Sequence, residues 1–407
     1  MLIAAIVAGA SLAAWIVLVA FRGGFWRVAP TLPHDAARAR EANRSLPAVT
    51  AVVPARNESA ILPETLPTVL GQTYPGPFRV VLVDDRSSDG TAEVARRLAA
   101  ASGNADRVVV LRGARLPNGW VGKVWAMAQG VGHDPASAAD YLWFTDADIA
   151  HDPDILDRLV ALAEGGRTGC RLDLVSIMAR LRVDSIWDRL LIPAFVYFFA
   201  KLYPFRWVCD PRRRTAGAAG GCMLVRRGAL ERAGGLERIR SALIDDCAFG
   251  RLLKRNGSAI WLGYARGVWS VRRYGTIASI WKMVARSAYD QLRYSPVLLL
   301  GTVLGMLFLY LLPPTATIGG LISAVLGGGG TLAWLTAGLA AAAWTSMSLT
   351  FIPLLRHHEA GIGHARALPL AGLLYTAMTV TSAWRHVTGR GTIWRATPDD
   401  GSGEGAT

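Results

Sequence analysis

Two long apolar stretches lie at opposite ends of the chain. Met1 to Phe21 contains no charged side chain, and its length is about what an α-helix needs to cross a hydrocarbon core roughly 30 Å thick. Pro296 to Leu355 also contains no charged residue, and it is too long for one crossing. We therefore expect membrane helices at both ends of the chain and a more polar folded region between them.

The first apolar stretch is typical of a membrane anchor. A cleaved signal peptide is the alternative, but no basic segment precedes the stretch and no convincing small-residue cleavage site lies before Arg22. Arg22 and Arg27 follow it closely, and basic residues at a helix end favour the cytoplasmic side. We expect an N-terminal transmembrane helix over 1–21 and a cytoplasmic location for the residues after it.

The C-terminal apolar stretch must hold more than one helix. Leu298 to Leu312 is the first, and Leu332 to Leu355 contains the last. Thr315 to Leu326, before four glycines, is either a short crossing or a non-cytoplasmic loop, and Leu368 to Trp384 adds another helix. We expect three or four C-terminal transmembrane helices within 296–384. Five membrane helices in total are favoured, because that number returns the polar tail to the cytoplasm.

The middle of the chain has a different pattern, from residue 45 to residue 292. Short β-branched runs alternate with helical stretches, which predicts an α/β domain with a mostly parallel sheet. The predicted strands are Val49 to Val53, Val80 to Val83, Val108 to Leu111 and Tyr141 to Thr145. The predicted helices are Ile61 to Leu70, Thr91 to Ala101 and Gly122 to Gln129, the second preceded by Ser88 and Asp89, which are capping residue types.

Two aromatic, amphipathic segments interrupt or follow this domain. Trp187 to Trp207 is apolar but carries Asp188, Arg189 and Lys201, so it is a poor membrane span. Aromatic residues with cationic ends suit a segment in the membrane interface, and a buried helix of the domain core is the alternative. Ile277 to Tyr294 is a second interfacial candidate.

Charge and cysteine content narrow the class of partner. The chain has 44 Lys and Arg residues against 30 Asp and Glu, which fits nucleic acid, an anionic membrane surface or a phosphate-bearing substrate. No RNA- or DNA-binding signature accompanies the charge, so we expect no nucleic acid partner. The four cysteines lack C-x-x-C spacing, which predicts thiols in a reducing compartment without zinc or disulfides.

Polar clusters close three of the four predicted strands. Ligands of open α/β sheets bind beyond the carboxyl ends of the strands. Two carboxylates separated by one residue can share a divalent cation, which can neutralise a diphosphate. An isolated D-x-D is more often a solvated turn, but three clusters in order favour a site. They are Pro54-Ala55-Arg56-Asn57-Glu58, Asp84-Asp85-Arg86-Ser87-Ser88-Asp89-Gly90-Thr91 and Thr145-Asp146-Ala147-Asp148.

Taken together, the motifs resemble family 2 glycosyltransferases of the GT-A fold. V-V-P-A-R-N-E, V-D-D-R-S-S-D-G-T, G-K-V-W-A, D-A-D and I-D-D-C-A-F-G-R-L-L occur in the family's order between about residues 48 and 265. The resemblance implies a Rossmann-like GT-A domain that uses a nucleotide-diphosphate sugar with Mg²⁺ or Mn²⁺ and inverts the sugar configuration. With the cytoplasmic anchor, it predicts a multi-pass enzyme of the bacterial inner membrane.

The same resemblance suggests roles for individual residues. Asp84 or Asp85 would bind the nucleotide base, while Asp146 and Asp148 would handle the ribose and the metal. Lys123 begins a predicted helix and would reach the donor phosphates as a point charge, with a solvated surface lysine as the alternative. The predicted donor-binding residues are Pro54, Arg56, Glu58, Asp84, Asp85, Lys123 and Asp146, and the predicted metal ligands are Asp146 and Asp148.

The predicted general base is one of two neighbouring aspartates. Asp246 matches the final acidic motif of the family, where the usual pair is Glu-Asp. Asp245 is either a second catalytic carboxylate or a plain acidic residue at the start of a helix over Cys247 to Lys254. The glycines in A-G-A-A-G-G-C-M allow close backbone approach near the acceptor, or mark a simple turn.

The acceptor is predicted to be a membrane lipid. Processive polysaccharide synthases carry Q-x-x-R-W, whereas this chain has Ala288-Tyr289-Asp290-Gln291-Leu292-Arg293-Tyr294, so single addition is favoured. P-A-F-V-Y-F-F-A-K-L-Y-P-F and A-A-G-G-C-M-L-V-R-R resemble glycosyltransferases associated with bacterial hopanoid biosynthesis, which implies a hopanoid or other polyisoprenoid acceptor. The alternatives are a processive synthase and a non-catalytic scaffold or transporter, although no charged residue marks a transport path in the C-terminal spans.

Overall fold

The structure is a computed structural model that describes residues 1–34, 46–133, 139–165 and 169–389. The described chain forms two compact units. A helical unit contains Met1–Ala29, Leu181–Trp207 and the part of the chain from Arg273, and a sheet unit contains Pro30–Arg180 and Val208–Arg272. The predicted domain start at residue 45 and most of the predicted polar tail, 385–407, lie outside the described residues.

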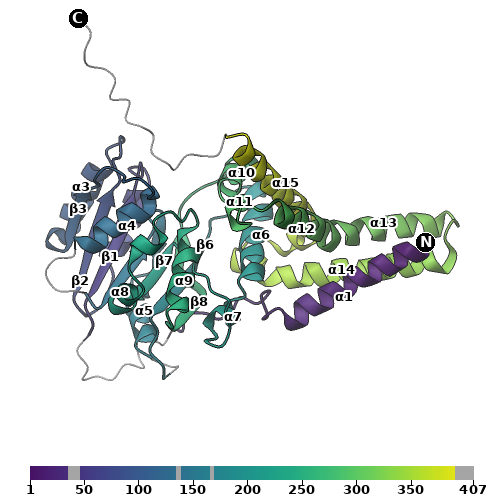
Figure 1. Cartoon of the computed structure of the whole chain (residues 1–407), viewed down its shortest axis with the longest axis horizontal. Coiled ribbons are helices and arrows are strands. Elements are labelled where there is room, and N and C mark those ends of the chain that lie inside the picture. The colour runs from purple at the N-terminus through teal and green to yellow at the C-terminus, as the bar shows by residue number, and fades with distance from the viewer. Residues whose placement is uncertain (35–45, 134–138, 166–168, 390–407) are drawn as a thin grey trace, which may run out of the picture. The chain divides into compact units, whose positions relative to one another are not determined.

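One eight-stranded sheet forms the sheet unit, in the order β3-β2-β1-β4-β7-β6-β8-β5 (Figure 1). The first four strands in this order are mutually parallel, which confirms the mostly parallel α/β prediction for this half. Each begins at the predicted residue or two residues before it, as Val108–Arg112 (β3), Phe78–Asp84 (β2), Val49–Ala55 (β1) and Tyr141–Thr145 (β4) show.

The other half of the sheet was absent from the sequence prediction. β7 pairs antiparallel with β4 and with β6, and β8 pairs parallel with β6 and antiparallel with β5. Nearly every residue of these strands is buried, as in the predicted β1 and β4, but β5 follows β4 with no helix between them and the four strands pair in mixed directions, so they depart from the regular alternation of parallel strand and helix. They are Cys222–Arg226 (β7), Leu174–Arg180 (β6), Ile260–Ser270 (β8) and Ile149–His151 (β5).

The helices of the sheet unit agree with the predicted ones where predictions were made. Thr91–Ala101 (α3) has the predicted bounds, and Asp89 accepts a hydrogen bond from the Thr91 amide at 3.1 Å. The remaining elements are Leu62–Leu70 (α2), Ala105–Arg107 (η2), Gly122–Gly132 (α4), Ile155–Ala163 (α5), Phe205–Cys209 (α7), Arg227–Arg232 (α8), Leu236–Ile239 (η3) and Asp245–Arg255 (α9).

Tight packing fixes the helices that carry the site residues. A Cβ on Gly130 of α4 would lie 2.5 Å from a methyl carbon of Val52 on β1, so glycine lets this helix approach the sheet closely. Similarly, a Cβ on Gly250 of α9 would lie 2.7 Å from the carbonyl carbon of Gly217. Real Cβ atoms do not make such contacts, and both helices are therefore packed closely against their neighbours at these glycines.

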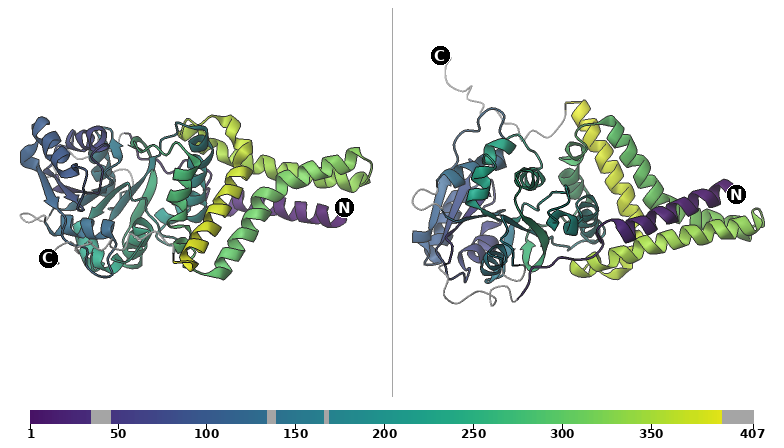
Figure 2. Two further views of the ribbon diagram at one scale, coloured as in Figure 1. Left: turned by 90° about the horizontal axis from the view of Figure 1, so that it is seen from above. Right: turned by 60° about the horizontal axis from the view of Figure 1, so that its bottom comes forward.

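The helical unit contains three helices long and apolar enough to cross a membrane, counted over the described residues. They are Leu2–Phe21 (α1), the run Pro296–Val325 and Gly330–His357 (α14). α1, α14 and the second part of the run, Leu312–Val325 (α13), lie side by side in Figures 1 and 2. The other elements are Ile186–Leu202 (α6), Ile277–Ala285 (α10), Ala288–Gln291 (α11), Ile362–Ala367 (η5) and Leu368–Val387 (α15).

The predicted division of the C-terminal apolar stretch was wrong at one point. Leu298 to Leu312 and Thr315 to Leu326 are parts of one run, built from Pro296–Met306 (α12), the π-helical segment Leu307–Leu311 (η4) and Leu312–Val325 (α13). Pro313 and Pro314 lie inside this run, where η4 passes into α13. α15 is not among the three candidates found in the described residues, and the number of membrane crossings stays a prediction.

The predicted interfacial segment forms α6 and belongs to the helical unit, not to the core of the sheet domain. Ser185 and Asp188 form a reciprocal capping box at its start. The Tyr197 hydroxyl lies 2.7 Å from the Thr350 hydroxyl of α14, and Tyr375 of α15 donates to the Leu191 carbonyl at 2.9 Å. Its position at a membrane interface stays a prediction.

Candidate active site

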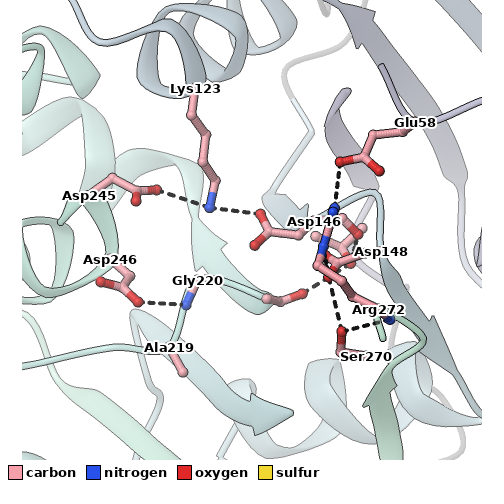
Figure 3. A network of polar contacts seen from close by, with 12 residues as sticks. Glu58, Lys123, Asp146, Asp148, Ala219, Gly220, Asp245, Asp246, Ser270 and Arg272 are labelled. Atoms are coloured by element: carbon pink, nitrogen blue, oxygen red, sulfur yellow. Dashed lines mark hydrogen bonds and ion pairs between the residues drawn. The ribbon is translucent and has the colours of Figure 1, made fainter. Parts of the chain in front are cut away.

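Lys123 connects two acidic groups that are distant in the sequence. Its ammonium lies 2.8 Å from a carboxylate oxygen of Asp146 and 3.3 Å from one of Asp245 (Figure 3). Burial opposes the positive charge, but the two carboxylates raise the pKa of Lys123 above its ordinary value. Lys123 is therefore an ion-paired residue, and not the solvated surface lysine that the sequence left as the alternative.

Local structure explains where these three side chains lie. Asp146 follows the fully buried strand β4, whose last residue, Thr145, bonds to the carbonyl of Gly221 at 3.1 Å and to the His151 ring at 2.8 Å. Lys123 is in the first turn of α4 and Asp245 in the first turn of α9. The carboxylate at a helix N-terminus is favoured by the helix dipole.

Asp246 lies in different surroundings from Asp245. One carboxylate oxygen accepts the Gly220 amide at 3.0 Å, and the other accepts the Cys247 amide at 2.6 Å. Burial and then the negative charge of Asp245 raise the pKa of Asp246 to about 6. A Cβ at Gly220 would lie 3.2 Å from the Lys123 ammonium and 3.3 Å from the Asp246 Cβ, so the glycine permits the close approach expected from the sequence.

Arg272 joins the two strand-end motifs and was not predicted. It forms ion pairs with Glu58 at 2.6 Å and with Asp148 at 3.0 Å, and Ser270 donates to the same Asp148 oxygen at 3.0 Å (Figure 3). Both residues lie at or just beyond the carboxyl end of β8. The rule that selected the other clusters would have found them if β8 had been recognised as a strand.

The loops after β1 and β2 hold each other in place. Asn57 accepts the Ser88 amide at 2.9 Å, and its own amide donates to the Ser87 hydroxyl at 2.9 Å. Asn57 and Arg86 have φ values of 55° and 58°. A left-handed backbone costs energy at non-glycine residues, and such residues are concentrated at ligand sites. The two loops therefore have a backbone conformation typical of a ligand-binding surface.

Asp84 and Asp85, the residues predicted to bind the nucleotide base, lie at the end of β2 and the start of the loop that follows it. Arg56 and Asp85 form an ion pair at 3.5 Å, and Asp84 accepts the Ser87 amide at 3.1 Å. Burial raises the pKa of Asp85 despite the neighbouring Arg56. Pro54 is part of β1, opposite Val83 of β2, and it therefore shapes the strand end without offering a polar group.

The network of charged side chains around Lys123 and Arg272 has an excess of negative charge. Glu58, Asp146, Asp148, Asp245 and Asp246 supply five carboxylates against the two cations of Lys123 and Arg272. Within the described ranges no cluster of three or more His, Cys, Asp or Glu residues is arranged to hold a metal ion alone. Asp146 and Asp148 offer hard oxygen donors, so a divalent cation here would need further oxygen ligands from a substrate.

The sequence of this chain is similar to the sequences of two kinds of known protein. Beta-monoglucosyldiacylglycerol synthase of Trichormus variabilis is 25% identical over 307 residues, which are 70% of this chain and 60% of that protein. An undecaprenyl-phosphate 4-deoxy-4-formamido-L-arabinose transferase of Pseudomonas aeruginosa is 32% identical over 185 residues, 43% of this chain and 45% of that protein. The chain therefore spans less than two thirds of the length of either relative.

A solved structure gives a relative in fold. A mannosyltransferase of Pyrobaculum calidifontis, in complex with GDP-Man and Mn²⁺, matches with a TM-score of 0.50 at 18% identity, over 94% of this chain and 99% of that one. This likeness confirms the expected GT-A fold. A family model described as "Glycosyltransferase like family 2" matches residues 47–289. This match covers more than half of the chain, and the chain therefore belongs to glycosyltransferase family 2.

Proposed function

We propose that this enzyme transfers one sugar, with inversion, from a nucleotide-diphosphate donor to a membrane lipid. The observation that carries the proposal is the bridge made by Lys123 between Asp146 and Asp245. It joins the carboxylate at the end of β4, predicted for the donor, to the aspartate pair predicted for proton removal. A donor diphosphate and an acceptor hydroxyl would therefore meet within one polar network.

For the donor, we assign the nucleotide base to Asp84 and Asp85 and the diphosphate to the Lys123 side. The paired loops after β1 and β2 support a rigid base site, because the Asn57 bonds fix their geometry. The Pyrobaculum calidifontis mannosyltransferase of similar fold is in complex with GDP-Man, which supports a nucleotide-sugar donor here. Pro54, Arg56 and Glu58 complete the proposed donor surface.

We assign a divalent cation, Mg²⁺ or Mn²⁺, to Asp146 and Asp148. The fold relative is in complex with Mn²⁺, and the excess of carboxylates in this site favours a cation. Such an ion supplies Lewis-acid stabilisation of the departing diphosphate. Arg272 and Lys123 each engage one oxygen of these aspartates, and they would balance the charge of the site when the donor is absent.

Asp246 is the proposed general base. The acceptor hydroxyl oxygen attacks the anomeric carbon from the face opposite the diphosphate, and the bond from that carbon to the diphosphate oxygen breaks. The hydroxyl proton passes to the Asp246 carboxylate. With a pKa of about 6, this group is ionised near pH 7 and basic enough to assist, and such assistance typically contributes about 10² to 10⁴ in rate.

A lipid acceptor is supported by the relatives and by the apolar helices. The relatives are named for transfer to diacylglycerol-linked and undecaprenyl-phosphate acceptors, and three described helices are long and apolar enough to span a membrane. We place the enzyme in the bacterial inner membrane with the sheet unit in the cytoplasm. A hopanoid or related polyisoprenoid is the acceptor that the two short sequence stretches favour.

One contact, made by Gln291, favours the addition of a single sugar over processive synthesis. Gln291, in the stretch that corresponds to the processive motif, donates to the Tyr203 hydroxyl at 2.6 Å inside the helical unit. This glutamine is therefore used in packing.

The test is to reconstitute the full chain in lipid vesicles with a panel of nucleotide-sugars and total bacterial lipid. Mass spectrometry should detect one glycosylated lipid that carries a single added sugar. Asp148→Ala and Asp246→Asn should lose at least about a hundredfold in rate, whereas the exposed Asp106→Asn should match the unmodified enzyme. Full activity of either site variant would contradict the proposal, and ladder-like products would favour the synthase.

A further inference from the structure

Two basic residues of the helical unit, Arg22 and Lys201, lie where α1 and α6 end. Arg22 follows α1, and its Nε donates to the carbonyl of Lys201 at 3.0 Å. The guanidinium carbon lies 5.0 Å from the centroid of the Trp207 ring. Over the described ranges neither cation forms an ion pair with an acidic side chain, and the charge that acts on Lys201 is that of Arg22.

Lys201 points its ammonium at an aromatic cluster. The nitrogen donates to the Tyr310 hydroxyl at 2.7 Å, and it lies 4.5 Å from the centroid of that ring and 5.6 Å from the centroid of Phe198. Burial and then Arg22 lower the pKa of Lys201 to about 7. Two neighbouring cations without an acidic partner destabilise each other, and a bound anion would remove that cost.

Tyr310 lies on the π-helical segment η4 and is fully buried. Its hydroxyl accepts from Lys201 and retains its own hydrogen to donate. Trp15 of α1 packs edge-on against this ring at 5.5 Å and donates to the Leu309 carbonyl at 2.8 Å. π-helical turns occur frequently at functional sites, and here the irregular turn carries the residue that binds the lysine.

Arg22 of this cluster lies at the end of a membrane-length helix. Arg22 comes directly after the 20 residues of α1, where cationic and aromatic side chains meet lipid headgroups. Gly23 and Gly24 both have φ of 63°. A Cβ on Gly23 would lie 2.8 Å from both Pro204 Cβ and the Trp207 indole nitrogen, so the turn that brings these groups together requires glycine.

We propose that Arg22, Lys201 and Tyr310 bind the phosphate group of a membrane lipid. A guanidinium fork, an ammonium and a hydroxyl offer several N–H and O–H donors to phosphate oxygens, and the charged ones give the stronger bonds. The adjacent Trp207 and Phe198 rings suit the apolar part of the lipid. The shared chemistry is a phosphate ester on a hydrocarbon chain, carried either by a bilayer phospholipid or by an isoprenoid phosphate.

The test measures lipid binding to the full chain in detergent by native mass spectrometry. The probes are phosphatidylglycerol, a polyisoprenyl monophosphate, diacylglycerol and inorganic phosphate. We expect saturable binding of one or both phospholipids, with the tighter one identifying the source, and at least tenfold weaker binding of diacylglycerol and inorganic phosphate. Arg22→Gln and Lys201→Met should each weaken phospholipid binding about tenfold or more.

Two further variants make the result decisive. Lys201→Arg keeps the charge and should retain most of the affinity, which shows that Lys201→Met did not act through misfolding. Lys282→Met removes an exposed lysine of the same unit and should leave affinity unchanged. Equal binding by the unmodified chain and the Arg22→Gln, Lys201→Met double variant would overturn the proposal, as would an equal loss in Lys282→Met. No nucleotide-sugar is present, so this outcome is independent of the proposed transfer.

Discussion

Asp245 and Asp246 are adjacent in sequence, yet their surroundings suit them to different tasks. Lys123 lies 3.3 Å from Asp245 and neutralises it, whereas Asp246 is held by the backbone amides of Gly220 and Cys247. Amide donors orient a carboxylate without supplying a full positive charge, so Asp246 keeps more of its basicity. This difference favours Asp246 as the base and Asp245 as its charged neighbour.

The pKa of Asp246 predicts the pH dependence of the enzyme. The base acts in its ionised form, and burial with the charge of Asp245 raises its pKa to about 6. We therefore expect kcat/KM to be constant above about pH 7 and to fall tenfold per pH unit well below pH 6, because the protonated form accumulates. A pH profile from 4.5 to 8.5 measures this directly; Asp245→Asn should shift its midpoint downwards, since one negative charge is lost. An unchanged or raised midpoint in that variant would contradict the assignment.

In the proposed metal site, Arg272 would compete with the ion for the Asp148 carboxylate. It lies 3.0 Å from Asp148 and 2.6 Å from Glu58, and its side chain is 37% exposed. Replacing it with Met leaves both carboxylates without this cation. We expect Arg272→Met to bind Mn²⁺ more tightly than the unmodified enzyme in the absence of donor, as measured by titration calorimetry.

The same variant should transfer sugar more slowly, because the site loses its charge balance. Exposed Arg238→Met serves as the control and should leave Mn²⁺ affinity unaltered. Weaker Mn²⁺ binding in Arg272→Met would show that the arginine organises the metal site.

At the scale of elements, α9 carries the proposed base, and a glycine within it, Gly250, allows it to pack closely against the neighbouring backbone. Gly250 faces the backbone of Gly217, where no Cβ fits. We expect Gly250→Ala to lower the free energy of unfolding of the sheet unit by about 1 to 3 kcal/mol and to reduce the transfer rate, because the helix must move away from the Gly220 amide.

Gly132→Ala in α4 is the matched control for this substitution. Nothing lies within 4 Å of a Cβ at Gly132, so alanine should be neutral or stabilising by up to about 1 kcal/mol. Thermal unfolding followed by circular dichroism compares the two variants. A similar melting temperature for both would show that α9 tolerates displacement.

The elements found from sequence were those with a periodic signal. β1 to β4 and α2 to α4 alternate in the regular βα order, and β-branched runs mark the strands. β5 to β8 were missed because they pair in mixed directions and depart from this regular order. Arg272 was missed with them, since a strand-end residue is recognised only when its strand is. η4 was missed because no local pattern announces a π-helical segment.

At the scale of the whole molecule, sequence predicted membrane helices at both ends but divided them differently. The length of an apolar stretch limits how many times it can cross a membrane. Packing against other helices decides where one helix ends and the next begins. Ser11 of α1 donates to the Phe308 carbonyl at 3.1 Å and Trp15 donates to the Leu309 carbonyl. These bonds satisfy carbonyls that the π-helical segment exposes, so α12 continues into α13 without a loop.

The four cysteines provide a test of orientation. Cys170 is exposed on the sheet unit, Cys209 is partly buried, and Cys222 and Cys247 are buried. If the sheet unit is cytoplasmic, a membrane-impermeant maleimide should label the chain in inverted vesicles and not in intact spheroplasts. Cys170→Ser should remove most of this label. Labelling of the unmodified chain in spheroplasts would place the sheet unit on the opposite side.

The ion pair between Glu58 and Arg272 has a consequence for biosynthesis. Its two partners are 214 positions apart, and ribosomes add about 5 to 20 residues per second, so the first carboxylate waits roughly 10 to 40 s for its arginine. During that interval the ribosome also produces Leu181–Trp207, which belongs to the helical unit. Until Arg272 has been made, the Glu58 and Asp148 carboxylates therefore lack this cation, and a free divalent cation would be an available counterion for them.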